Sequence, residues 1–231
     1  MSITIDSTVG EWVVERPGLA RVFEKLGIDY CCGGKKPLAD VCRERGLDPA
    51  TVSALLTADN GDPKEDALDV ANLSLSALAD HIEQTHHAYL KSELPRLQPL
   101  VERIANRHAD KNPRVVELPG MFAAFREELE MHMVKEERIL FPLIRQIEQN
   151  KQDASVGCGI SNPIRVMEEE HQHAGDALAK MSELTDGFQT PPLACNTYRA
   201  VMHSLAQLEA DMHRHVHKEN NVLFPRALAA F

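Results

Sequence analysis

The sequence predicts an all-α protein, an up-down four-helix bundle preceded by a small N-terminal helical domain. After residue 73 there are four long segments with helical apolar periodicity and no alternating strand pattern of useful length. Gly- and Pro-containing breaks separate these segments, and such short connections favour antiparallel neighbouring helices. One peptide is also written twice, as HMVKEERILFP at 132–142 and as HVHKENNVLFP at 215–225. The duplication predicts two related helices within the bundle.

The chain divides into two domains and a linker. Residues 1–57 form the small domain, where short helical patterns such as LARVFEKLGI and TVSALLT are interrupted by Gly and Pro. Residues 58–72 are expected to be a linker, because ADNGDPKEDALD is rich in Asp, Gly and Pro and poor in apolar residues. The bundle then covers residues 73–231. Its helices are expected at roughly 73–108, 114–150, 161–186 and 192–229.

Composition narrows the class of protein. The net charge of −10 argues against a nucleic-acid-binding surface. No apolar run approaches the ~20 residues that span a bilayer, and the first residues lack the features of a secretory signal. Five scattered cysteines indicate no disulfide framework and fit a reducing compartment. We therefore expect a cytoplasmic protein with no nucleic-acid or membrane partner, whether monomer or homodimer.

The repeated peptide places a His and a Glu four residues apart, as His132 with Glu136 and as His215 with Glu219. Residues four apart project from one face of a helix, so each pair can reach one point in the bundle interior. Glu137 is rotated about 100° from Glu136 and is expected to lie off that point. Carboxylates and imidazoles on facing helices of a bundle are typical of a dinuclear metal centre.

The other two helices are expected to supply the remaining ligands. The candidates are His81, His86 and His87 on the first helix, and His171 and His173 on the third. Spacing favours two of them, because His87 lies 45 residues before His132 and His171 lies 44 before His215. By helical angle, however, His86 is nearer the centre of the apolar stripe of Leu90, Leu94 and Leu97. Periodicity alone therefore does not choose between His86 and His87.

The resulting ligand set contains imidazoles and carboxylates and no thiolate. Its members are His87, His132, Glu136, His171, His215 and Glu219. Such a set suits iron or manganese better than a soft metal. Two bridging carboxylates would leave each metal two imidazoles and open positions. Three further carboxylates, those of Glu128, Glu170 and Asp211, are expected to orient ligand imidazoles through the other ring nitrogen.

Cys31 and Cys32 form a separate candidate site in the small domain. Neighbouring cysteines rarely close a disulfide without strain, and Gly33 and Gly34 give the backbone unusual freedom. We expect an exposed, mobile thiol pair that handles iron, a persulfide, a nitrosyl group or a redox equivalent. The alternative is a structural turn with one buried cysteine. The other three cysteines, Cys42, Cys158 and Cys195, have no informative spacing and are expected to be structural.

The two half-sites on a four-helix frame resemble the hemerythrin-like domain, a non-haem di-iron bundle. DYCCGG at 29–34 resembles the small N-terminal domain of the di-iron proteins that repair iron–sulfur clusters. The resemblance implies two irons per chain, an oxo or hydroxo bridge and the six ligands named above. It favours His87, which begins the family's H-x-Y-L-x-x-E-L-P pattern. Oxygen-carrying hemerythrins have a second His at the position where this chain has Gly175, which makes simple oxygen carriage doubtful.

By this resemblance the chain is expected to repair iron–sulfur clusters damaged by nitric oxide or oxidants. Damaged iron–sulfur proteins would be its clients, and it would supply iron to them or react with nitric oxide. Two alternatives are a di-iron enzyme that reduces nitric oxide or a peroxide, and a sensor that binds oxygen or nitric oxide. A stress-response repair protein is favoured over a multiple-turnover enzyme.

Overall fold

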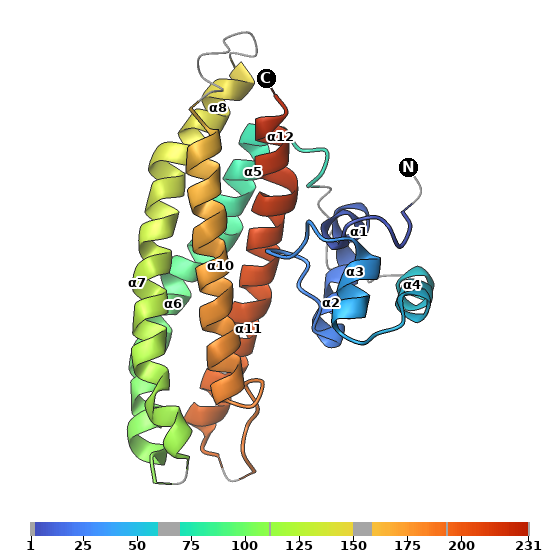
Figure 1. Cartoon of the computed structure of the whole chain (residues 1–231). Coiled ribbons are helices and arrows are strands. Elements are labelled where there is room, and N and C mark those ends of the chain that lie inside the picture. The colour runs from blue at the N-terminus through green and yellow to red at the C-terminus, as the bar shows by residue number, and fades with distance from the viewer. Residues whose placement is uncertain (1–2, 60–69, 111, 150–158, 193, 231) are drawn as a thin grey trace.

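The computed structural model describes residues 3–59, 70–110, 112–149, 159–192 and 194–230. The described residues form helices and a single isolated β-bridge, between Thr8 and Pro37. A long four-helix bundle stands beside a small domain of short helices (Figure 1). The predicted all-α class and bundle are therefore confirmed. Most of the predicted linker, residues 58–72, lies outside the described part of the chain.

Four short helices build the small domain around its own core. They are α1 (Val9–Glu15), α2 (Ala20–Leu26), α3 (Leu38–Glu44) and α4 (Pro49–Ala58), with a 3-10 turn, η1 (Pro17–Leu19), before α2. The side chain of Thr8 accepts a hydrogen bond from the backbone N–H of Glu11, whose carboxylate accepts one in return from the backbone of Thr8. Trp12, Phe23 and Leu38 fill the core of this domain.

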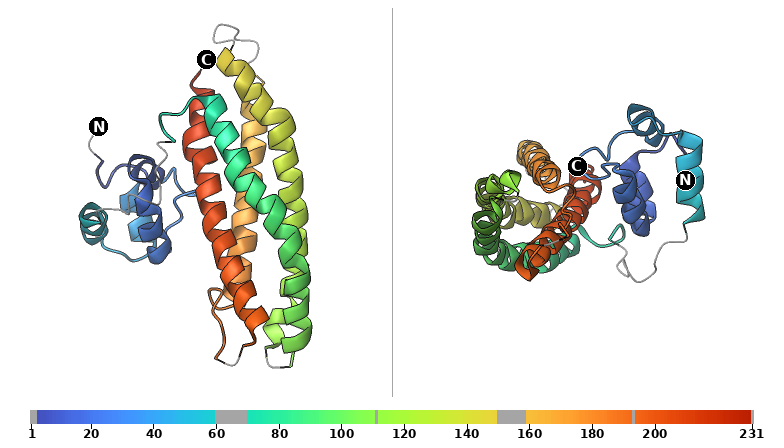
Figure 2. Two further views of the ribbon diagram at one scale, coloured as in Figure 1. Left: turned by 180° about the vertical axis from the view of Figure 1, so that it is seen from behind. Right: turned by 90° about the horizontal axis from the view of Figure 1, so that it is seen from below.

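The four bundle helices follow the predicted order, with ends that differ from the prediction by a few residues. The first comprises α5 (Leu75–Ile82), η2 (Glu83–His87) and α6 (Ala88–His108); the second, after a 3-10 turn η3 (Pro113–Val116), comprises α7 (Leu118–Lys135), η4 (Glu136–Leu140) and α8 (Phe141–Gln149); the third is α10 (Ser161–Leu184); the fourth comprises α11 (Asn196–Lys218), η5 (Glu219–Leu223) and α12 (Phe224–Leu228). Neighbouring helices run antiparallel (Figure 2).

Three of the four bundle helices contain a π-helical turn, and each turn begins or ends at a predicted ligand. His87 is the last residue of η2, Glu136 the first of η4 and Glu219 the first of η5. Such turns occur mostly as single insertions in α-helices and frequently at functional sites. A π turn holds one more residue than an α turn. Beyond a π turn, the residues that point into the bundle are therefore displaced by one sequence position from those that a regular α-helix would turn inward.

The bundle core consists of two apolar clusters with a polar layer between them. One cluster includes Leu94, Phe122 and Leu205, and the other includes Ile82 and Phe141. Along each bundle helix the predicted ligands fall between members of the two clusters. The ligand layer is thus closed on both sides by packed hydrocarbon.

The small domain docks on the fourth bundle helix (Figure 2) through the segment 29–34, called the Cys loop below. Asn221 Nδ2 donates hydrogen bonds to the carbonyl oxygens of Tyr30 at 3.3 Å and Cys31 at 3.1 Å. His217 Nδ1 lies 3.2 Å from the carbonyl oxygen of Tyr30. A Cβ atom on Gly34 would lie only 2.6 Å from Asn221 Oδ1 and 2.5 Å from the carbonyl oxygen of Tyr30. Glycine is therefore required where Asn221 inserts.

Candidate metal centre

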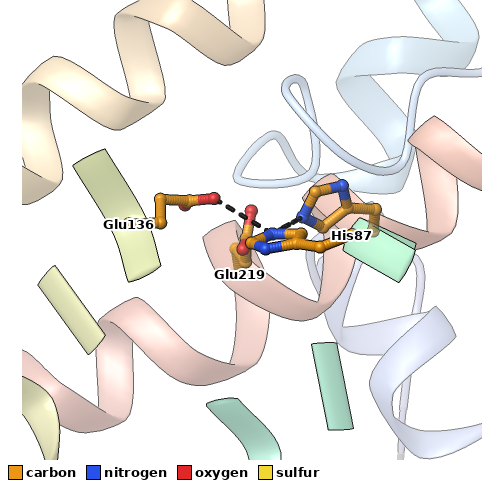
Figure 3. A group of neighbouring side chains, drawn as sticks. His87, Glu136 and Glu219 are labelled. Atoms are coloured by element: carbon orange, nitrogen blue, oxygen red, sulfur yellow. Dashed lines mark hydrogen bonds and ion pairs between the residues drawn. The ribbon is translucent and has the colours of Figure 1, made fainter. Parts of the chain in front are cut away.

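The six predicted ligands converge at one place in the bundle interior, each at most 3% exposed. They form two overlapping groups of potential metal ligands. His87 and His215 belong to one group and His132 and His171 to the other, while Glu136 and Glu219 belong to both. Within each group the ligand atoms lie within 4.8 Å of one another. Figure 3 shows His87, Glu136 and Glu219 pointing into this shared space. The duplicated peptide thus contributes both shared carboxylates.

Each imidazole presents its Nε2 atom to the centre. His132 Nε2 lies 3.2 Å from Glu136 Oε2, and His215 Nε2 lies 3.1 Å from Glu219 Oε1. The lone histidines reach across helices, with His87 Nε2 at 3.3 Å from Glu136 Oε2 and His171 Nε2 at 3.1 Å from Glu219 Oε2. Imidazole nitrogens also face each other, at 3.3 Å between His87 and His215. The nitrogen and oxygen donors therefore surround one small volume.

The buried donors fit a pair of metal ions. Both carboxylate oxygens of Glu136, and Oε2 of Glu219, are buried and accept no hydrogen bond from the described residues. Imidazole Nε2 atoms lie 3.1 to 3.3 Å from Glu136 Oε2 and Glu219 Oε2 without forming a hydrogen bond. Burying an ionised carboxylate without hydrogen bonds costs roughly several kcal/mol, and native structures rarely tolerate it. Cations between the shared carboxylates and the imidazoles would satisfy these atoms. The mixture of nitrogen and oxygen donors without sulfur suits iron.

The pKa values of the polar layer also favour metal binding. Although burial lowers the pKa of His132, the carboxylates of Glu136 and Glu170 overcome it and raise that pKa to about 10. Burial likewise raises the pKa of Glu219, but His215 and His171 hold it well below its usual range. Without metal, the layer therefore carries ionised carboxylates balanced by protonated imidazole. Metal ions would take the place of those protons.

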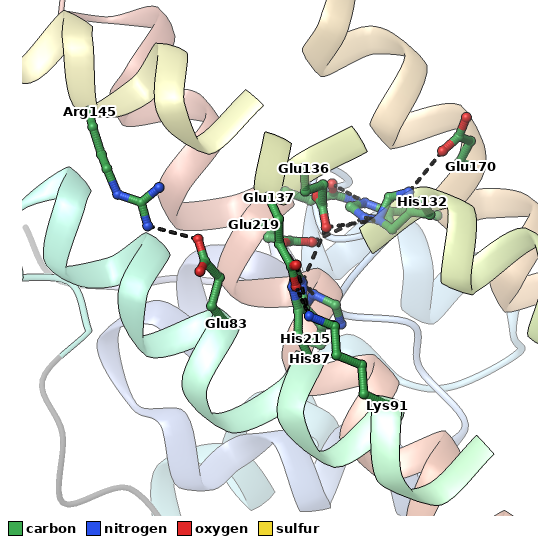
Figure 4. Close-up of polar contacts among 12 residues, drawn as sticks. Glu83, His87, Lys91, His132, Glu136, Glu137, Arg145, Glu170, His215 and Glu219 are labelled. Atoms are coloured by element: carbon green, nitrogen blue, oxygen red, sulfur yellow. Dashed lines mark hydrogen bonds and ion pairs between the residues drawn. The ribbon is translucent and has the colours of Figure 1, made fainter. Parts of the chain in front are cut away.

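A ring of outer partners fixes three of the four imidazoles through Nδ1. Figure 4 shows two of them, Glu170 beside His132 and Glu137 beside His87. His132 Nδ1 lies 2.9 Å from Glu170 Oε2, and His87 Nδ1 lies 2.8 Å from Glu137 Oε1. His171 Nδ1 lies 2.8 Å from Asn220 Oδ1. A bond at Nδ1 selects the tautomer whose Nε2 lone pair can bind a metal, and orients the ring.

The structure changes the predicted set of outer partners. Glu170 is in the expected place, where its hydrogen bond to His132 lowers its pKa to about 2. Asp211 instead lies 2.9 Å from Nδ1 of His86, which is not among the predicted ligands. Glu128 is exposed and lines a cavity of about 450 Å³ that reaches His132 and Glu170. The predicted role of Glu128 and Asp211 beside ligand imidazoles is therefore wrong.

Two outer partners were missed by sequence reasoning. Glu137 was expected to lie off the site, yet it contacts His87, and Asn220 was not considered. They occupy the same position of the repeated peptide, immediately after the shared carboxylates Glu136 and Glu219. Each contacts the lone histidine of a neighbouring helix. Superposing the two copies of the repeat would have indicated this role.

The near-symmetry of the two halves breaks at one position. Glu170 precedes His171 and contacts His132, whereas the equivalent residue before His87 is His86. The ring of His86 stacks on that of His215, with centroids 5.2 Å apart and planes at 3°. The Nδ1 atom of His215 consequently has no hydrogen-bond partner among the described residues. The half-site of His87 and His215 thus has one imidazole, that of His215, without a hydrogen bond to orient it, whereas both imidazoles of the other half-site have one.

The choice between His86 and His87 is settled by where their rings point. Both are buried, but His86 Nε2 lies 3.0 Å from Lys218 Nζ, outside both ligand groups. His81 also contacts Lys218, at 3.1 Å, and His173 is exposed. His87 alone among the first-helix candidates joins the ligand layer.

The Cys loop differs from the expected exposed and mobile thiol pair. Cys31 is only 6% exposed and packs into the bundle core, and Cys32 is half-buried beside it. A Cβ atom on Gly175 would lie 3.9 Å from Cys32 Sγ, so this thiol lies over the turn that follows His171. Among the remaining cysteines, Cys42 is buried and Cys195 exposed; Cys158 lies outside the described residues.

A helical bundle that gathers four histidines and two shared glutamates defines a hemerythrin-type di-iron protein. Residues 78–227 match the family model described as Hemerythrin HHE cation binding domain, and residues 5–60 match a Domain of Unknown function (DUF542). Over 224 residues, 97% of each chain, the sequence is 37% identical to the iron-sulfur cluster repair protein YtfE of Escherichia coli O157:H7. It is 36% identical, with the same coverage, to the protein of that name from Escherichia fergusonii. The chain belongs to this family of hemerythrin-type iron–sulfur cluster repair proteins.

Like its relatives, the chain has a hemerythrin domain whose cofactor is a non-haem di-iron centre. No described helix combines the length and apolar content needed to cross a membrane.

Proposed function

We propose that the chain repairs iron–sulfur clusters damaged by nitric oxide or oxidants, with two irons held by the six converging residues. The observation that carries the proposal is the pair of buried, shared carboxylates, Glu136 and Glu219, three of whose four oxygens lack a hydrogen bond from the described residues. The relatives named above are called iron-sulfur cluster repair proteins, and the match covers 97% of each chain. Damaged iron–sulfur proteins in the cytoplasm are the proposed clients.

The protein's own residues hold the donors in place and cover the layer with apolar side chains above and below. Glu137, Asn220 and Glu170 orient imidazoles through Nδ1. The apolar clusters on either side lower the local dielectric constant, which strengthens the electrostatic interactions between the donors. When bound, the iron pair supplies both iron for a cluster and redox-active sites. Gly175 has no side chain to add as a ligand.

The 450 Å³ cavity beside His132 favours a second candidate function. It is lined by two ligand imidazoles, those of His132 and His171, and by the carboxylates of Glu128 and Glu170. A small molecule such as nitric oxide or a peroxide could reach the centre there and be reduced. Repair by iron supply and reduction of nitric oxide make different demands, because only reduction requires continued turnover with an electron donor.

The test compares the iron-loaded protein with two variants in reactivating a nitric-oxide-damaged cluster enzyme under anaerobic conditions. Glu219→Leu removes a shared carboxylate and should abolish both iron binding and reactivation. Glu130→Gln alters a surface carboxylate paired with Arg126 and should retain both. Isotopically labelled iron that moves into the client supports iron supply. Sustained nitric oxide consumption with an electron donor, without transfer of label, would instead support the enzyme. Reactivation by Glu219→Leu equal to the unmodified protein would refute the proposed role of the centre.

A further inference from the structure

A second group of potential metal ligands lies in the Cys loop. The ligand atoms of Asp29, Cys31 and Cys32 lie within 4.8 Å of one another. Outside the di-iron centre, no other group of this kind occurs in the part of the chain that the structure describes. Its donors are two thiols and a carboxylate, a softer set than the imidazoles and carboxylates of the bundle.

The loop holds these donors in a fixed arrangement. The carboxylate of Asp29 accepts hydrogen bonds from the backbone N–H groups of Cys31 and Gly33, both at 2.8 Å. The thiol of Cys31 lies 3.1 Å from Asp29 Oδ1. Asn221 holds the carbonyl oxygens of the same loop against the bundle. Because the surrounding contacts already fix the loop, little ordering remains to be done when a ligand binds.

The surroundings favour a cation. The donors line a cavity of about 480 Å³ between the small domain and the bundle. Four carboxylates and one guanidinium line it. The guanidinium is that of Arg45, and the carboxylates are those of Glu24, Asp29, Asp176 and Glu209. In a partly enclosed cavity such an excess of negative charge concentrates cations.

We propose that Asp29, Cys31 and Cys32 form a mononuclear site for a thiophilic divalent cation, such as Zn²⁺ or Fe²⁺, at the interface between the two domains. Three protein donors leave a fourth position open to water or to an exchanging ligand. The site goes beyond the repair function and does not depend on it.

Binding exchanges protons for the metal. The hydrogen bond to Cys32, together with burial, raises the pKa of Cys31 well above its usual range, so the Cys31 thiol is protonated in the metal-free protein. A divalent ion that binds both sulfurs displaces the two thiol protons to solvent and forms two metal–thiolate bonds. No electron is transferred in this step. The resulting site has thiolate character, which the di-iron centre lacks, and this difference makes it detectable.

The test titrates the iron-loaded protein with Co²⁺ under anaerobic conditions and follows thiolate-to-cobalt charge-transfer absorption. We expect one equivalent to bind with this band while the iron content stays unchanged. Cys31→Ser and Cys32→Ser should each remove the band, and Asp29→Asn should weaken binding by at least about tenfold. Cys195→Ser is the matched control that should leave the titration as it is, since Cys195 is exposed and does not line the cavity. Unchanged iron content and helicity would show that each variant is folded.

Three results would overturn the proposal. They are the absence of a charge-transfer band in the unmodified protein, its persistence in both cysteine variants, and equal affinity of the unmodified protein and Asp29→Asn. The first would mean that the thiols bind no such ion. The second would assign the band to other cysteines, and the third would remove the carboxylate from the site.

Discussion

Glu137→Gln is expected to weaken iron binding although the substituted residue is not itself a metal ligand. Its carboxylate lies 2.8 Å from His87 Nδ1 and is held by Lys91 Nζ at 2.6 Å. Glutamine keeps the shape and removes the charge. Loss of such an outer partner costs about 10- to 100-fold in metal affinity, or roughly 1.4 to 2.7 kcal/mol. Glu136→Gln should cost more, because that carboxylate belongs to both ligand groups.

The assay is anaerobic competition with a chelator, with iron per chain measured against chelator concentration. Glu130→Gln is the control on the same helix, since this carboxylate is 43% exposed and pairs only with Arg126 in the described contacts. Iron retention should fall in the order Glu130→Gln, Glu137→Gln, Glu136→Gln. A Glu137→Gln protein that keeps iron as well as the control would refute its orienting role. Two irons in Glu136→Gln at the same chelator concentration would refute the ligand set.

Three further predictions follow from contacts around the centre. His86→Glu should improve iron retention against the chelator by up to about tenfold, because it offers His215 Nδ1 an acceptor; unchanged retention would contradict this. Asn221→Leu should speed alkylation of Cys31 while iron content stays the same, as measured by mass spectrometry; an unaltered rate would argue against its role in docking. In metal-free protein, the lowered pKa of Glu170, about 2, stabilises the fold above pH 4.5, and this contribution disappears as pH falls towards 2. The thermal stability gap between unmodified protein and Glu170→Gln should therefore narrow on acidification, and a constant gap would contradict the argument.

The repeated peptide was the most informative part of the sequence. It predicted the helices and the convergence of His132 and Glu136 with His215 and Glu219, because a helical spacing of four fixes which side chains share a face. The lone His on the first helix was harder. An α-helical stripe extended backwards from Leu90 reaches position 86, but the π turn η2 adds a residue there. Both His86 and His87 are consequently buried, and only His87 faces the ligand layer.

The docking of the Cys loop was beyond the reach of sequence patterns. The Asp-, Gly- and Pro-rich composition before the bundle indicates a tether, and composition alone does not say where a tethered domain rests. The contact depends on Asn221, which meets Cys31 from 190 residues away along the chain. Gly34 leaves room for this side chain. No local pattern encodes that pairing, so the thiols were expected to be exposed.

The turn of the fourth helix at the junction of α11 and η5 contacts both the ligand layer and the Cys loop. His215 and Glu219 point into the ligand layer, and His217 and Asn221, two residues on from each, reach the Cys loop. The small domain is therefore fastened to the same few residues of backbone that hold one histidine and one shared carboxylate. One turn of helix thus serves both the docking of the small domain and the placement of two metal ligands.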